Sequence, residues 1–201
     1  MDYAQFVIDQ LLNYWMFTAV AVIILIGWVA NLLGVDQDED IVGFRYTEMP
    51  HMQPIRIPTD GRGFWSAIWC WFWEVRQWEI AKDWHFEVNG EQYVIPKGFQ
   101  FDGASVPKFL ASWLSPVGIL LMGGLIHDYI YKYTVLMKKG QKSVSEPMTQ
   151  KQADQLFRDI NIEQNGIHVL NYCAYYALRV GGFMAWNGHR KVNASPTLKG
   201  K

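Results

Sequence analysis

The stretch that decides the fold passes from a polar turn into an apolar helix: Phe101-Asp102-Gly103-Ala104-Ser105-Val106-Pro107, then Ile119-Leu120-Leu121-Met122-Gly123-Gly124-Leu125-Ile126, then His127-Asp128-Tyr129-Ile130-Tyr131-Lys132-Tyr133. The first part has the composition of a loop, and the apolar run predicts a helix that carries His127. A buried histidine titrates near neutral pH, so it needs a polar partner or it costs stability. We expect that partner to be Asp154, from a later helical run.

His127 and Asp128 point about 100° apart around a helix, so they serve different purposes. We expect His127 to transfer a proton and Asp128 to bind a cation. Asp102 and Gly103 would add a second carboxylate and backbone carbonyls, and such oxygen ligands favour Ca²⁺. Asp154 would accept from the other ring nitrogen of His127 and fix its tautomer. A His-Asp pair on an apolar helix is most often structural, but three polar clusters in apolar surroundings favour a functional site.

Three motifs in this order resemble those of the prokaryotic and fungal secreted phospholipase A2 family: Asp-Gly-x-Ser-x-Pro, His-Asp-x-x-Tyr-Lys/Arg and Ala-Asp-x-x-Phe-x-Asp. The resemblance implies that His127 is the general base that activates water and that Asp154 orients it. It also implies that Asp128 binds Ca²⁺, and that Asp102 and the neighbouring carbonyl of Gly103 complete the ion site.

A second resemblance covers roughly residues 84–186. It is to an uncharacterised family of tailed phages and prophages, domain-of-unknown-function family 1353. Four motifs carry it, and they read here as residues 94–107, residues 127–131, residues 153–157 and the closing run Tyr175-Tyr176-Ala177-Leu178-Arg179-Val180-Gly181-Gly182. This resemblance implies a phage or prophage protein.

The cysteine content departs from the phospholipase pattern. Secreted phospholipases of this kind are stapled by disulfides, whereas this chain has 2 cysteines, Cys70 and Cys173. Two cysteines in a chain of 201 residues are more often free and buried, although a bridge between them stays open. The net charge of −1 provides no broad basic surface, so we expect no nucleic-acid partner.

An uncharged stretch near the N-terminus predicts a membrane anchor. Residues 11–35 contain no charged side chain, and they lie between Asp9 and the acidic run at residues 36–40. This length is enough to span a bilayer, and Trp15 and Trp28 lie toward its ends as in an aromatic belt. A signal peptide would need basic residues that are missing here, and a buried core helix is the other alternative. We therefore expect a single-pass protein of the virion membrane or the host inner membrane, in an orientation left open.

A second aromatic stretch, at residues 64–78, is too short to span a bilayer. As a helix it would carry Trp65, Trp69, Phe72 and Trp73 on one face. It is either an in-plane interfacial segment on lipid or a hydrophobic helix packed against the domain. The expected partners are accordingly a lipid bilayer and phospholipid, with a homo-oligomer or other phage membrane proteins as further possibilities.

Local signals predict the remaining elements. Asn89-Gly90 between two alternating runs predicts a β-hairpin over residues 84–95. Residues 117–136 predict one long helix, and a polar loop follows it. Thr149 and Gln152 form a capping box that starts the next helix.

The C-terminal part predicts one further helix, over residues 167–180, which ends at Gly181-Gly182. The expected fold class is mainly α with a small β-hairpin around a phospholipase A2-like helical core, plus one transmembrane helix. The expected domains are an anchor at residues 1–35, a connector at 36–83, a phospholipase A2-like domain at 84–186 and a polar tail at 187–201.

Three functions fit these features. The first is a membrane-anchored, Ca²⁺-dependent phospholipid ester hydrolase. The second is a non-catalytic phage membrane or structural component that serves lysis, membrane remodelling or the virion. The third is a metal phosphohydrolase, which needs an upstream histidine ligand on a helix, whereas His51 and His85 fall in a predicted loop or strand.

Overall fold

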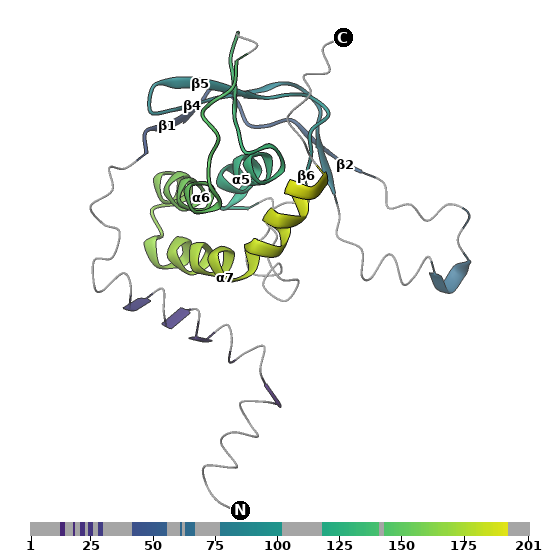
Figure 1. Cartoon of the computed structure of the whole chain (residues 1–201), viewed down its shortest axis with the longest axis vertical. Helices are drawn as coiled ribbons and strands as arrows, with labels where there is room; N and C mark the ends of the chain where they lie inside the picture. The colour runs from purple at the N-terminus through teal and green to yellow at the C-terminus, as the bar shows by residue number, and fades with distance from the viewer. Residues whose placement is uncertain are drawn as a thin grey trace, which may run out of the picture.

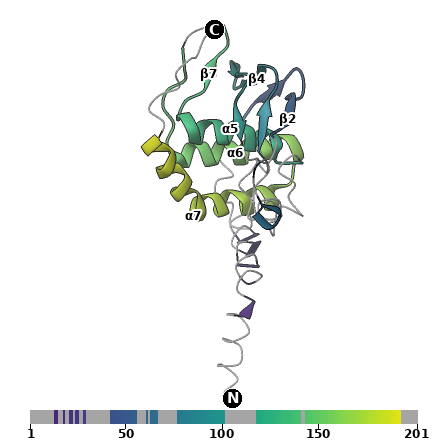
Figure 2. The ribbon, with the colours of Figure 1, turned by 90° about the vertical axis from the view of Figure 1, so that its right-hand side faces the viewer.

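The computed structural model describes residues 42–55, 77–101, 118–140 and 143–192, with residues 61 and 63–66 and short pieces between residues 13 and 29. The described helices that carry the candidate site are α5 (Leu121–Tyr133), α6 (Gln150–Asn165) and α7 (His168–Val192). Figures 1 and 2 show α5 and α6 side by side, with the strands on one side of them and α7 on the other.

The strands form two antiparallel sheets. One has the order β1-β4-β5-β7 and comprises β1 (Phe44–Tyr46), β4 (Trp84–Val88), β5 (Glu91–Ile95) and β7 (Met137–Lys138). The other has the order β2-β3-β6 and comprises β2 (Met52–Pro54), β3 (Trp78–Ile80) and β6 (Gln100–Phe101).

The β4–β5 hairpin confirms the expectation drawn from Asn89-Gly90. Both turn residues have a positive φ, 51° at Asn89 and 81° at Gly90, as a two-residue type I′ turn requires. The Asn89 side chain also accepts a hydrogen bond of 2.9 Å from the amide of Gly43, which holds β1 beside β4. Trp84, Phe86 and Val88 alternate into the core, so one face of this sheet packs onto the helices.

The expected fold class is wrong for the described part of the chain. Instead of a mainly α fold with one small hairpin, the structure has seven strands in two antiparallel sheets. The unexpected strands, β2, β3, β6 and β7, are only two or three residues long, and Met52 of β2 pairs with Ile80 far along the chain. Such short strands carry no periodic pattern, because distant pairing rather than local sequence creates them.

The expected single-pass membrane protein is also overturned. No helix in the described residues is long and apolar enough to cross a membrane. The most apolar of the site helices, α5, has 13 residues and so reaches about 20 Å, against the roughly 30 Å of a bilayer core. Most of residues 11–35 lie outside the description, as do Asp102, Gly103 and residues 67–76 of the aromatic stretch.

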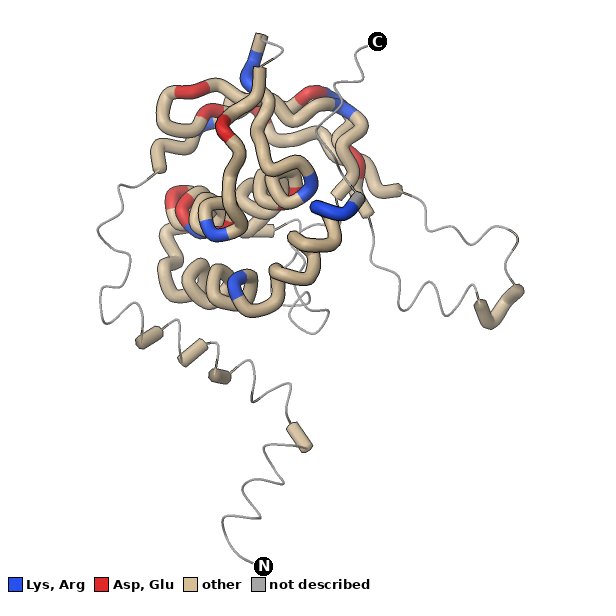
Figure 3. The backbone as a smooth tube through the Cα atoms, viewed as in Figure 1, with Lys and Arg blue, Asp and Glu red and all other residues tan. Residues whose placement is uncertain are grey.

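The loops between strands join the two sheets. Lys82 forms an ion pair of 2.6 Å with Glu48, and the indole of Trp84 donates to the Glu48 carbonyl at 2.8 Å. Lys138 of β7 pairs with Glu91 of β5 at 3.1 Å. Figure 3 accordingly shows basic and acidic residues interspersed along the strands. Solvent screens exposed pairs of this kind, so the buried aromatic face dominates the stability of the sheets.

The capping box of α6 is confirmed. The amide of Gln152 donates to the Thr149 hydroxyl, and the amide of Thr149 donates to the Gln152 side chain at 2.8 Å. Gly166 ends the helix in the left-handed conformation, as its sequence position predicts. This cap fixes the first turns of α6, and Asp154 lies in them.

The expected end of the last helix at Gly181-Gly182 is wrong, because α7 continues to Val192. Residues beyond the glycines pack on α5: the Trp186 ring meets the Tyr131 ring edge-on at 5.1 Å, and Arg190 donates to the Tyr131 carbonyl. These tertiary contacts outweigh the local preference of glycine for helix ends. The polar tail expected from residue 187 therefore begins as part of a helix.

Candidate functional site

The candidate site lies on α5, which is buried along most of its length. Leu125, Ile126 and Ile130 are fully buried toward the core. His127 is 5% exposed, so the imidazole lies in the interior of the protein. Asp128 is nearer the surface, with 14% of its side chain exposed. The helix thus places one titratable group inside the protein and the next one at its edge.

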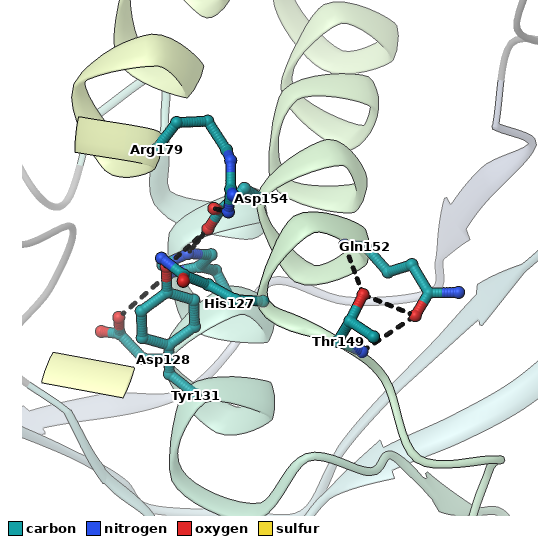
Figure 4. A network of polar contacts seen from close by, with 8 residues as sticks. His127, Asp128, Tyr131, Thr149, Gln152, Asp154 and Arg179 are labelled. Atoms are coloured by element: carbon teal, nitrogen blue, oxygen red, sulfur yellow. Dashed lines mark hydrogen bonds and ion pairs between the residues drawn. The ribbon is translucent and has the colours of Figure 1, made fainter. Parts of the chain in front are cut away.

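The structure brings His127 and Asp154 together between α5 and α6. His127 Nε2 lies 2.9 Å from Asp154 Oδ1, and Asp154 is completely buried. Figure 4 shows the imidazole between Asp154 and Asp128, each of which contacts it from a different direction. The Phe157 ring meets the imidazole at 5.4 Å, so an apolar wall borders this pair.

The partners of Asp154 define which imidazole nitrogen carries the proton. Arg179 Nη1 donates to Asp154 Oδ2 at 2.7 Å, and the two side chains form an ion pair. An ionised carboxylate only accepts hydrogen bonds, so His127 Nε2 must be the protonated, donating nitrogen. In the neutral imidazole the Nδ1 lone pair is then the basic atom. It lies 3.6 Å from Asp128 Oδ1.

Tyr131 and Arg179 complete the surroundings of Asp154, and sequence reasoning did not select them as site residues. The Tyr131 hydroxyl donates to Asp154 Oδ1 at 2.6 Å, and it accepts from Gln150 at 3.1 Å. Arg179 reaches Asp154 from α7, as Figure 4 shows. Asp154 therefore receives three donors from two helices. Hydrogen bonding to Asp154 also raises the pKa of Arg179, so the guanidinium stays protonated.

The sequence did contain a signal for both missed residues. Tyr131 is the tyrosine of the His-Asp-x-x-Tyr motif, and Arg179 is the arginine of the closing Tyr-x-Ala-x-Arg-x-x-Gly motif. The glycine of that closing motif is Gly182, where a Cβ atom would collide with the Tyr131 hydroxyl. The three motif residues thus converge on one contact between α5 and α7.

Opposing effects act on the pKa of His127. Burial disfavours the charged imidazolium and lowers the pKa, but the contacts with Asp128 and Asp154 outweigh it and raise the pKa above 6.5. Burial and the bond to Asp154 also raise the pKa of Tyr131, which keeps the phenol protonated as a donor. The site therefore holds a proton on Nε2 and offers a strengthened base at Nδ1.

The cation ligands expected from the sequence are described only in part. Asp128 stands beside His127, whereas Asp102 and Gly103 lie outside the described residues. Within the described residues, no group of three or more His, Cys, Asp or Glu side chains is arranged to hold a metal ion. One carboxylate of the expected set is thus in place beside the imidazole. Cys173 is a free, buried thiol, and Cys70 is not described.

The fold and the site define a small α+β protein with a buried histidine oriented by an aspartate. The chain belongs to the family described as protein of unknown function (DUF1353), whose model matches residues 78–178. The match begins at β3 and ends one residue before Arg179. No curated protein and no solved structure matches the chain.

Proposed function

We propose that this protein is a hydrolase that cleaves a carboxylic ester of a phospholipid, with His127 as the general base. The observation that carries the proposal is the hydrogen bond from His127 Nε2 to the buried Asp154, which leaves Nδ1 as the basic atom. Burying a His-Asp pair costs stability, so its presence in the interior favours a functional role. General bases have such surroundings.

The reaction would divide its steps among the described residues. His127 Nδ1 takes a proton from water while Asp154 holds the ring in one orientation and stabilises the imidazolium. Arg179 and Tyr131 hold the Asp154 carboxylate in place by hydrogen bonds. Asp128 would help to hold Ca²⁺, which when bound polarises the ester carbonyl and stabilises its oxyanion. Asp102 and Gly103 complete this ligand set on the basis of sequence alone.

The order of the motifs supports the phospholipid substrate, and the resemblance to the phage and prophage family 1353 supports the phage or prophage setting. The three motifs that include Asp102, His127 and Asp154 follow one another as in the secreted phospholipase A2 family. We therefore expect the lipid ester rather than a phosphate ester to be the bond that is cleaved.

Release of fatty acid from phospholipid micelles by the purified full chain tests this function. We expect release that depends on Ca²⁺, stops with a chelator and is lost in His127→Asn. A His85→Asn variant is the matched control, since His85 lies on β4, and it should keep full activity. Absence of release by the wild-type protein at every Ca²⁺ concentration would refute the proposal.

A second candidate function is a non-catalytic component of the phage particle or of lysis. It is favoured by the saturation of Asp154, which bonds to His127, Tyr131 and Arg179 and so ties α5, α6 and α7 together. In that case His127→Asn would change the free energy of unfolding, and the wild-type protein would release no fatty acid.

A further inference from the structure

Two buried asparagines differ in a way that the hydrolase mechanism above does not explain. Asn171 is fully buried, and its amide donates to the Asn165 side chain at 2.8 Å and to the Ile167 carbonyl at 2.9 Å. Asn161 is equally buried, yet neither its Oδ1 nor its Nδ2 has a hydrogen-bond partner among the residues that the structure describes. An unpaired buried amide costs free energy, so its position calls for a physical reason.

Asn161 lies on the same face of α6 as Asp154. The two residues are seven positions apart, which is two helical turns. Across the interface, Asn161 packs against Gly123 of α5, where an added Cβ would lie 2.7 Å from Asn161 Cγ and 2.8 Å from Oδ1. Only glycine leaves room for the amide, so Gly123 and Asn161 are a matched pair.

Gly123 precedes His127 by four residues, so the two positions are neighbours on one stripe of α5, about 5–6 Å apart. Helical side chains lean toward the N-terminus of their helix, which brings the imidazole of His127 toward the space above Gly123. The Asn161 amide packs against Gly123 at this end of the stripe. The two facing stripes are therefore Tyr131, His127 and Gly123 on α5, and Asp154, Phe157 and Asn161 on α6.

We propose that Asn161 positions the water molecule that His127 activates, an inference that rests on the proposed hydrolase function. Buried waters characteristically bond to otherwise unpaired polar groups. The water donates one hydrogen to His127 Nδ1 and the other to Asn161 Oδ1, so an oxygen lone pair is free to attack.

The balanced step follows from this arrangement. The water oxygen forms a bond to the ester carbonyl carbon while its proton passes to His127 Nδ1, and the carbonyl π electrons move onto the carbonyl oxygen. When those electrons return, the bond to the alkoxy oxygen breaks. The leaving alcohol takes the proton from His127. One ester and one water thus give one acid and one alcohol, and Asn161 neither gains nor loses a proton.

Removing the Asn161 amide should have opposite effects on stability and on turnover. Asn161→Leu replaces the unpaired amide with an apolar group of similar branching, so we expect an unchanged or raised Tm. We expect kcat for Ca²⁺-dependent hydrolysis of dioleoylphosphatidylglycerol in detergent micelles to fall about 100-fold, because a misplaced nucleophile costs that much. KM should change little, since the water does not bind the lipid.

Two further variants control this measurement. Asn161→Ala removes the amide and introduces no large side chain that could disturb packing. We expect it to show the same loss of kcat as Asn161→Leu. Asn171→Leu removes an amide that is paired, so it should lower Tm and leave kcat unchanged. If the wild-type protein is active and both Asn161→Leu and Asn161→Ala keep kcat within about twofold of it, the role of Asn161 is overturned while the proposed function stands. A wild-type protein without hydrolysis would overturn the proposed function and this inference with it.

Discussion

The two sides of the His127 imidazole differ in how they are built. On the Nε2 side, Asp154 is fully buried and receives donors from His127, Tyr131 and Arg179 at 2.6 to 2.9 Å. On the Nδ1 side, Asp128 is partly exposed and stands 3.6 Å away, beyond hydrogen-bond distance. The difference indicates that the Asp154 side holds the ring in place, whereas the Asp128 side is where chemistry can occur.

Removal of Asp154 should have the largest effect of the changes considered, and it tests directly whether the two sides of the ring differ in structural role. Asp154→Ala leaves Arg179 without its carboxylate and leaves Tyr131 without an acceptor, so we expect the free energy of unfolding to fall by about 3 kcal/mol or more. Asp128→Ala, on the other side of the ring, should change it by less than about 1 kcal/mol. Urea unfolding at one pH measures both variants. Equal losses would show that the two sides do not differ in structural role.

Calcium should act through the Asp128 side. A ligand that binds only the folded protein stabilises it by about 2.7 kcal/mol at a hundredfold excess over its Kd. We expect Ca²⁺ to raise the Tm of the wild-type protein and of Tyr131→Phe, but not of Asp128→Asn. Thermal unfolding with and without Ca²⁺ measures this, and Mg²⁺ is the control ion. An identical Ca²⁺ shift in Asp128→Asn would exclude Asp128 as a ligand.

The contact between Tyr131 and Gly182 offers a finer test of the Asp154 side. A Cβ at Gly182 would collide with the Tyr131 hydroxyl, so Gly182→Ala should cost about 1–3 kcal/mol. Gly181 has open space around it, and Gly181→Ala should stabilise the helix by about 0.5–1 kcal/mol. Denaturant unfolding should therefore show a lower free energy of unfolding for Gly182→Ala and a higher one for Gly181→Ala.

A double-mutant cycle separates this collision from other effects. Tyr131→Phe removes the hydroxyl that donates to Asp154 and that Gly182→Ala would strike. Gly182→Ala should therefore cost less in the Tyr131→Phe background than in the wild type, with an interaction free energy of at least about 0.5 kcal/mol. Additive effects would contradict the close contact between α5 and α7.

Whether the sequence predicted a feature depends on how far apart along the chain the interacting residues lie. Asn89-Gly90 and the Thr149 cap act over two to four residues, and both were predictable because backbone geometry alone selects those residue types. The proximity of His127 and Asp154 followed from the cost of burying a lone imidazole. Arg179 was missed because its role depends on α7 crossing α5 and α6: the closing motif contains this arginine, but the motif does not show which residue the arginine contacts.

The sheets were missed for a related reason. β2 and β3 consist of three residues each and pair with each other across more than twenty positions of chain, so neither strand is long enough to show a hydrophobic periodicity. The same limit applies to β7, which lies where the sequence indicated the end of a helix and a polar loop. α5 instead ends at Tyr133, with Thr134 in the left-handed conformation.

The smallest expected effect is a pH dependence of stability that arises from both sides of the ring. The pKa of His127 is raised above 6.5 in the folded protein, so the folded state binds a proton more tightly than the unfolded chain. That stability is fully present below pH 6.5 and is lost as pH rises through the folded pKa. Urea unfolding in chelator from pH 6 upward should show this decline, and His127→Asn should remove it. A wild-type stability that instead rises over this range, relative to His127→Asn, would mean that burial outweighs the two carboxylates.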